Sequence, residues 1–144
     1  MTQEQKKLVQ ISFASLHNQT DRLSDLLYKK LFELEPKTQV LFHGDMKDQE
    51  QRLIRMLHIA VDDINDPQLI QPKLYTLGMI HHSYGIEAHH YTSFGEALIY
   101  SLRTMLGKEF TPQLEEAWRA AYRYLASTMF NFPHHEQDVQ VPHN

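Results

Sequence analysis

A histidine in the middle of an apolar helical stripe is the feature of this sequence with the clearest chemistry. Residues spaced as on one face of a helix form the stripe: Leu74, Leu77, His81 and Tyr84. The neighbouring His82 lies about 100° further round the helix, so the two imidazoles cannot enter one pocket. His81 has two readings: a core histidine bonded to a backbone carbonyl, or a ligand for a metal or cofactor.

A second polar residue heads another apolar face. The segment from about residue 47 to residue 64 has Gln49, Leu53, Met56 and Ala60 at helical spacing. A glutamine in this place is either exposed near the start of the helix or a hydrogen-bond donor that faces an apolar space. The sequence pattern leaves both open.

Composition narrows the functional classes. The chain has 144 residues, 42% of them hydrophobic, and a net charge of 14 − 18 = −4. That mildly acidic balance argues against nucleic acid or an anionic membrane as the main partner. The chain has no cysteine, which excludes disulfides, thiolate metal sites and cysteine nucleophiles. The N-terminus lacks the apolar core of a signal peptide, and no apolar run is long enough to span a membrane, so we expect a soluble cytoplasmic protein.

Six main helices are needed to position these residues. The chain contains no convincing β-alternation, internal repeat or glycine-rich phosphate loop, so the sequence predicts an all-α fold. Thr2 with Gln5 is typical of a capping box, Thr20-Asp21 of a helix start, and Thr111 before a proline of another. We expect one domain over residues 1–132 and a disordered tail at 133–144.

Some apolar residues are assigned to the core by pattern alone. Ile11 belongs to the apolar face expected for the first helix. Pro36 should end the second helix near residue 35, after which Val40 and Phe42 should return to the core. Gly85 should stop the helix of His81, because glycine adopts the left-handed conformation that a C-terminal cap needs.

The order of these motifs resembles that of a globin. Pro36 followed by Phe42 is similar to the globin corner whose phenylalanine packs on haem. Residues 80–86 resemble the Lys-His-x-Ser-Leu-Gly-Ile segment of flavohaemoglobins, and residues 94–98 resemble their Val-Gly-Glu-x-Leu. Residues 117–122 resemble the last helix of neuroglobin and flavohaemoglobin. The likeness runs over about residues 5 to 131, and the short loop before Gln49 is similar to that of Hell's Gate type globins.

The resemblance implies a three-on-three helical sandwich that holds haem b. His81 would be the proximal iron ligand, and Tyr28 with Gln49 would form the distal pair. The other residues that would contact haem are Phe42, Leu53, Leu77, Ile86, Tyr91 and Phe94 as walls, with Arg52 near a propionate. A glutamate that bonds the proximal histidine through a tyrosine in flavohaemoglobins has its position at His135 here, so that triad is not expected.

The resemblance also implies a function. A hydroxyl and an amide facing the ligand would bind dioxygen tightly, and the same pocket would take nitric oxide and carbon monoxide. Tight binding of oxygen suits nitric oxide detoxification by a bacterial haemoglobin better than oxygen transport. The chain ends without the reductase domain of flavohaemoglobins, so a separate reductase is expected. Three alternatives stay open: an oxygen or sulfide scavenger or sensor with little turnover, an interaction protein that has lost haem, and coordination of ferric iron by the Tyr28 phenolate at high pH.

Overall fold

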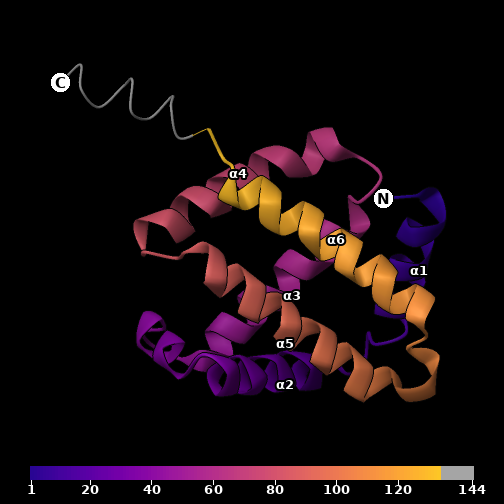
Figure 1. The fold of residues 1–144 in the computed structure, drawn as a ribbon, viewed down its shortest axis with the longest axis horizontal. Helices are drawn as coiled ribbons and strands as arrows, with labels where there is room; N and C mark the ends of the chain where they lie inside the picture. The colour runs from indigo at the N-terminus through magenta and orange to yellow at the C-terminus, as the bar shows by residue number, and fades with distance from the viewer. Residues whose placement is uncertain (134–144) are drawn as a thin grey trace.

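Six α-helices and two short 3₁₀ helices make up residues 1–133, the part of the chain that the computed structural model describes (Figure 1). In chain order they are α1 (Gln3–Ala14), α2 (Thr20–Leu34), η1 (Pro36–Leu41), α3 (Met46–Asp62), α4 (Pro67–Ser83), α5 (Ala88–Leu106), η2 (Gly107–Glu109) and α6 (Pro112–Phe130). No strand occurs in these residues, so the predicted all-α fold is confirmed. The tail expected to be disordered lies, beyond residue 133, outside the described part.

The helices form two crossed layers. One contains α2, α5 and α6, and the other contains α1, α3 and α4. Within the first layer α2 packs along α5, and α5 runs beside α6 (Figure 1). Across the layers α1 and α4 pack on α6, and α2 packs on α3. This arrangement agrees with the expected three-on-three sandwich.

The core lies between these layers. Its fully buried side chains come from five of the six helices, for example Val9, Leu23, Leu27, Leu74, Leu98, Leu102 and Trp118. The indole N–H of Trp118 donates to the Ser12 hydroxyl over 2.9 Å, so the polar atom of this buried ring is satisfied. Packing of α1 on α6 is therefore both apolar and hydrogen-bonded.

Helix starts follow local chemistry in two of three predicted cases. Thr2 and Gln5 form the capping box, with reciprocal bonds of 3.0 and 2.9 Å, and Thr111 caps α6. The prediction that Thr20-Asp21 caps α2 is wrong. The N-cap residue is Gln19, whose side chain makes no capping bond, so α2 depends on its packing against α5 rather than on its first turn.

Three apolar residues assigned to the core are exposed instead, and each has a geometric reason. Ile11 is 69% exposed, because it lies about 200° round α1 from the buried Val9. Val40 is 71% exposed, because consecutive side chains of η1 point in different directions. Thr38 is buried instead, and Phe42, directly after η1, packs on the core. Tyr84 is 66% exposed, because it follows the last residue of α4 and no longer obeys the helical period.

A glycine sets how closely α4, the helix of His81, approaches α6 in the other layer. A Cβ atom on Gly78 would collide with the backbone carbonyl of Met129 in α6. The missing side chain therefore lets α4 lie directly on the α6 backbone. Since His81 is three residues further along α4, this contact also fixes the depth at which the imidazole enters the fold.

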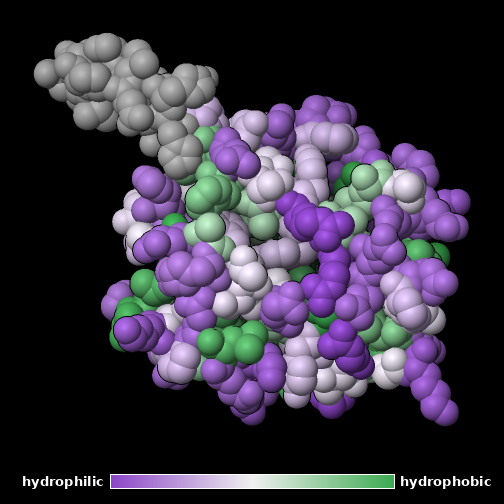
Figure 2. Space-filling model, in the orientation of Figure 1, coloured by the Kyte–Doolittle hydropathy of each residue, from purple (hydrophilic) through white to green (hydrophobic). Residues whose placement is uncertain are grey.

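The surface in Figure 2 is mostly hydrophilic, with hydrophobic residues exposed in small separate groups. No helix among residues 1–133 is long and apolar enough to cross a membrane.

Candidate functional site

Tyr28 and Gln49, the pair expected on the distal side, meet in the structure. Tyr28 lies near the middle of α2 and is 4% exposed, while Gln49 is half-buried in the first turn of α3. The Gln49 side-chain N–H donates to the Tyr28 hydroxyl oxygen over 3.2 Å. The reading in which Gln49 is merely an exposed residue is therefore wrong.

Arg52 continues this contact into a chain of three side chains. Its guanidinium donates to the amide oxygen of Gln49 over 3.0 Å, from one turn further along α3. With the amide oxygen occupied by Arg52, the amide N–H groups of Gln49 point toward Tyr28. The spacing of three residues between Gln49 and Arg52 is a sequence signal for this contact. The resemblance to globins implies only a haem-propionate role for Arg52.

The Tyr28 phenol is kept in its protonated form by its surroundings. Its ring lies edge-on to Phe42 and Phe94, with centroids 5.4 and 6.3 Å away. Burial among these rings raises the pKa of Tyr28 above its ordinary value of 10.0, and the hydrogen bond from Gln49 offsets only part of that effect. Because the oxygen already accepts from Gln49, the O–H proton of Tyr28 is left to donate to a third group.

His81 is half-buried near the end of α4 and bonds to a side chain of α5. Its Nδ1 atom lies 3.1 Å from the Tyr91 hydroxyl. The partner of this ring nitrogen is therefore a side-chain hydroxyl and not the backbone carbonyl expected for a core histidine. Burial lowers the pKa of His81 below 6.5, which keeps the imidazole neutral at neutral pH. His82 is exposed and turns toward Phe132, with ring centroids 5.7 Å apart, as expected from its place on the helix.

Tyr91 is itself held by α6. The Tyr122 hydroxyl donates to the backbone carbonyl of Tyr91 over 2.6 Å, and the Tyr91 ring lies 5.8 Å from that of Phe130. The sequence pointed to Tyr91 but gave no sign that Tyr122 anchors it, because the contact joins residues 31 positions apart. The glutamate position of the flavohaemoglobin triad falls on His135, outside the described residues.

Helix α5 connects the two groups. Tyr91, which bonds His81, and Phe94, which packs on Tyr28, are three residues apart and share one side of this helix. The remaining predicted wall residues Leu53, Leu77 and Ile86 are half-buried, as are Phe42, Tyr91 and Phe94. Only Arg52 of the predicted contact residues is exposed. The structure joins three of the ten predicted site residues, Arg52, Gln49 and Tyr28, in one hydrogen-bonded chain, and two others, His81 and Tyr91, in a second contact. The remaining five are half-buried apolar side chains: Phe42, Leu53, Leu77, Ile86 and Phe94.

This donor set fits haem. Iron in haem takes one neutral imidazole from the protein, and the rest of the porphyrin needs apolar surroundings. His81 would supply the imidazole, and the half-buried wall residues would supply the apolar surface. Helices α3 and α4 meet where Ala60 packs with Ile70 and Leu74, whereas Gln49 lies in the first turn of α3 and His81 lies near the end of α4. A flat group between Gln49 and His81 would therefore lie away from that contact.

The order of the helices and the set of donor residues fit a haem-binding protein, and comparisons with known proteins agree with this class. The Globin family model matches residues 25–129. Neuroglobin-1 of Oncorhynchus mykiss is 25% identical over 143 residues, with 90% of each chain covered. The flavohemoprotein of Bordetella parapertussis is 29% identical over 132 residues, which cover 90% of this chain and 33% of that one. The chain belongs to the globin family and is a haem-binding globin; it spans about one third of the flavohemoproteins that it matches.

Two solved structures have the same fold. One is an engineered carbene transferase made from a Rhodothermus marinus protein described as a nitric oxide dioxygenase. It is 26% identical with a TM-score of 0.83, and the match covers 100% of this chain and 99% of that one. The other is a bacterial globin from Campylobacter jejuni, 20% identical with a TM-score of 0.81, covering 95% and 99% of the two chains. The second likeness concerns the fold alone.

Proposed function

We propose that this globin binds dioxygen between His81 and the Tyr28–Gln49 pair and uses it to oxidise nitric oxide to nitrate. The observation that carries the proposal is the 3.2 Å bond from the Gln49 amide to the Tyr28 hydroxyl oxygen. That bond fixes the direction of the phenol, so that its own proton is available to a ligand. Two relatives support the choice of reaction: a flavohemoprotein, and the protein described as a nitric oxide dioxygenase.

Each residue has a defined part in this proposal. His81 would hold haem b, which would supply the iron that binds the diatomic ligand. Tyr28 and Gln49 donate hydrogen bonds to a partly charged diatomic ligand, each contributing about 1–3 kcal/mol. Together they slow ligand release by orders of magnitude, which favours consumption of oxygen over its delivery. The aromatic side chains of Phe42 and Phe94 keep water away from these donors.

Tyr91 and Arg52 position the residues that would face the haem, His81 on one side and Gln49 on the other. The Tyr91 hydroxyl holds the Nδ1 edge of His81, which leaves Nε2 for the iron. Arg52 holds the amide oxygen of Gln49, which keeps its N–H groups on the ligand side. We assign Arg52 this positioning role in addition to contact with a propionate. The wall residues Leu53, Leu77 and Ile86 would pack against the porphyrin.

The reaction needs one electron for each turnover, since nitric oxide, dioxygen and one electron together give nitrate. A reductase supplied by another protein would provide that electron. The direct test is nitric oxide consumption in air by the haem-loaded protein with a generic flavin reductase and NADH. We expect catalytic consumption with nitrate formed in equal amount, and a much lower rate for Tyr28→Phe.

Absence of turnover with a competent reductase would contradict the enzymatic proposal. If oxygen were still bound tightly in that case, the protein would be a scavenger or sensor of diatomic ligands, a role that the same pocket supports. Weak oxygen binding together with no turnover would remove the distal-pair argument as well.

A further inference from the structure

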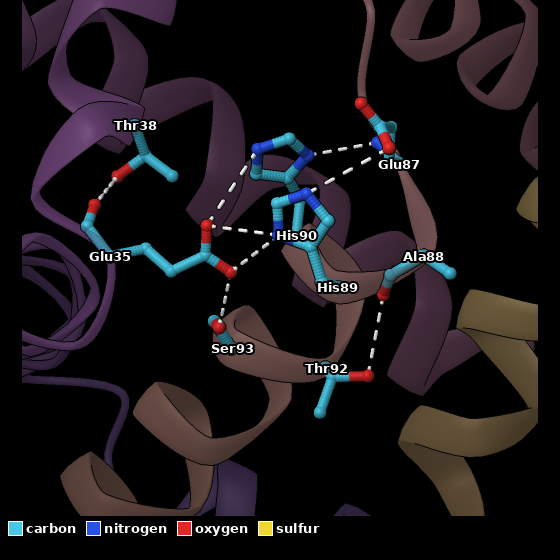
Figure 3. Close-up of polar contacts among 8 residues, drawn as sticks. All are labelled: Glu35, Thr38, Glu87, Ala88, His89, His90, Thr92 and Ser93. Atoms are coloured by element: carbon cyan, nitrogen blue, oxygen red, sulfur yellow. Dashed lines mark hydrogen bonds and ion pairs between the residues drawn. The ribbon is translucent and has the colours of Figure 1, made fainter.

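We propose that Glu35, His89 and His90 form a binding site for a divalent transition-metal ion, with zinc as the preferred occupant. The cluster lies where the end of α2 meets the start of α5, and it includes none of the residues assigned to haem (Figure 3). Glu35 is the residue directly after α2, and the two histidines belong to the first turn of α5. The proposal does not depend on the proposed nitric oxide activity.

The three side chains already converge on one point. Nδ1 of His89 lies 2.9 Å from Oε1 and 3.1 Å from Oε2 of Glu35. Nε2 of His90 lies 3.8 Å from the same Oε2 atom. One ligand atom from each residue lies within 4.8 Å of the other two. Ligand atoms around a tetrahedral zinc ion are about 3.3 Å apart, so small rotations of these side chains suffice to enclose it.

Convergence of two successive histidines is unusual for a helix. Neighbouring side chains normally point about 100° apart. Here the two ring centroids are only 4.0 Å apart, because the His90 ring folds back to accept the backbone N–H of Glu87 over 2.8 Å. Figure 3 shows both imidazoles turned toward the Glu35 carboxylate. The helix start therefore brings together donors that a helix interior would separate.

Outer contacts hold the ligands in the way that metal sites require. The Ser93 hydroxyl donates to one Glu35 oxygen over 2.6 Å, and a Glu87 oxygen lies 3.9 Å from Nε2 of His89. A carboxylate behind the second nitrogen of a ligating histidine orients the ring and raises its basicity.

The chemistry of the donors selects the class of ion. Two imidazoles and one carboxylate suit zinc and its neighbours, whereas calcium and magnesium prefer an all-oxygen shell. Binding has a cost at both histidines. Nδ1 of His89 donates its proton to the Glu35 carboxylate, and this proton must move to Nε2 before Nδ1 can ligate. Nδ1 of His90 accepts the Glu87 N–H, so the proton of the neutral ring is on Nε2 and must move to Nδ1 before Nε2 can ligate. The site should therefore bind zinc with moderate rather than extreme affinity.

An ion at this place would tie together segments 54 residues apart in the sequence. Ligand binding to the native state alone stabilises it in proportion to the logarithm of ligand concentration. We therefore expect zinc to raise the melting temperature of the haem-loaded protein, and equal concentrations of calcium or magnesium to leave it unchanged.

The test is a calorimetric titration of the full-length, haem-loaded protein with zinc chloride. Glu35→Gln and His89→Gln, which preserve side-chain size, should each weaken binding at this site by about tenfold or more and remove the thermal shift. His17→Ala removes an exposed histidine in the turn that follows α1 and is the matched control. A variant with His134→Ala and His135→Ala controls for zinc binding by the tail histidines. Soret and far-ultraviolet spectra should be the same in all variants, which confirms that each is folded.

Wild-type zinc affinity in both Glu35→Gln and His89→Gln would overturn the proposal and leave a hydrogen-bonded contact between α2 and α5 only. Loss of all zinc binding in the tail variant alone would overturn it equally. Loss in Glu35→Gln and His89→Gln, with both controls unchanged, supports it.

Discussion

The two sides of the proposed haem site are built on different principles. On the distal side three polar side chains, Arg52, Gln49 and Tyr28, hold one another in a chain of bonds of 3.0 and 3.2 Å. On the proximal side a single imidazole, His81, is held by one hydroxyl of α5. Loss of one distal donor would leave the other in place, whereas loss of His81 would remove the proposed iron ligand itself. We therefore expect substitution of His81 to cause loss of haem, and single substitutions on the distal side to weaken oxygen binding only in part.

The largest effect is expected for His81→Ala. Loss of the iron ligand should speed haem dissociation by more than about tenfold, since removal of an outer partner alone can have an effect of that size. His82→Ala is the matched control and should retain haem, because this exposed ring turns toward Phe132. Haem transfer to an apoprotein acceptor measures both rates. Faster loss from His82→Ala than from His81→Ala would show that the proximal residue is misassigned.

Next in size are Tyr28→Phe and Gln49→Leu. Each removes one donor worth about 1–3 kcal/mol, so oxygen release from the ferrous protein should be about fivefold faster or more. Haem retention should be unchanged, since neither residue lies on the proximal side. Flash photolysis or stopped-flow mixing gives the release rates. If both variants released oxygen at the wild-type rate, the distal pair would have no part in binding.

A smaller effect should follow from Arg52→Ala, because Arg52 orients Gln49 and does not itself face the ligand in this account. Without the bond from Arg52 the Gln49 amide can rotate, so oxygen release should be about two- to tenfold faster than in the wild type. This effect should be smaller than that of Gln49→Leu. The double variant Arg52→Ala/Gln49→Leu should release oxygen no faster than Gln49→Leu. Arg55→Ala, an exposed arginine of the same helix, serves as control. Additive effects in the double variant would mean that Arg52 acts independently of Gln49.

Tyr91→Phe should have the smallest effect on this scale. It removes the hydroxyl 3.1 Å from Nδ1 of His81 but keeps the ring against Phe130. Haem should stay bound and oxygen release should change little, while the reduction potential of the iron shifts, because the basicity of the axial imidazole depends on its partner. Spectroelectrochemical titration measures that shift. A potential equal to that of the wild type would show that the hydroxyl does not influence the imidazole.

Much of this could be predicted from the sequence because the informative signals are local. Periodicity placed six helices, and Pro36 and Gly85 placed two of their ends. Two of the core predictions that failed, Val40 and Tyr84, lie where the α-helical period no longer applies. The third, Ile11, lies inside α1 but on the face away from the buried Val9. A short 3₁₀ helix and a C-terminal cap both turn side chains away from the positions that a continuous helix would give them.

The contacts of the site were harder to foresee, because they depend on how helices pack. The bond from Gln49 to Tyr28 spans 21 residues, and the anchor from Tyr122 to Tyr91 spans 31. No local pattern encodes either distance. The cluster of Glu35, His89 and His90 was missed for the same reason, since its carboxylate and its imidazoles come from separate helices.

The most direct test of the central claim, that His81 and the Tyr28–Gln49 pair enclose a haem with an open ligand position, is an absorption spectrum. It should be recorded on the purified protein after addition of hemin, first ferric, then reduced, and then with carbon monoxide or oxygen. A strong Soret band that shifts with reduction and again with each gas is the predicted result. Absence of a Soret band after hemin addition would contradict the account and leave a helical protein with a buried tyrosine–glutamine contact.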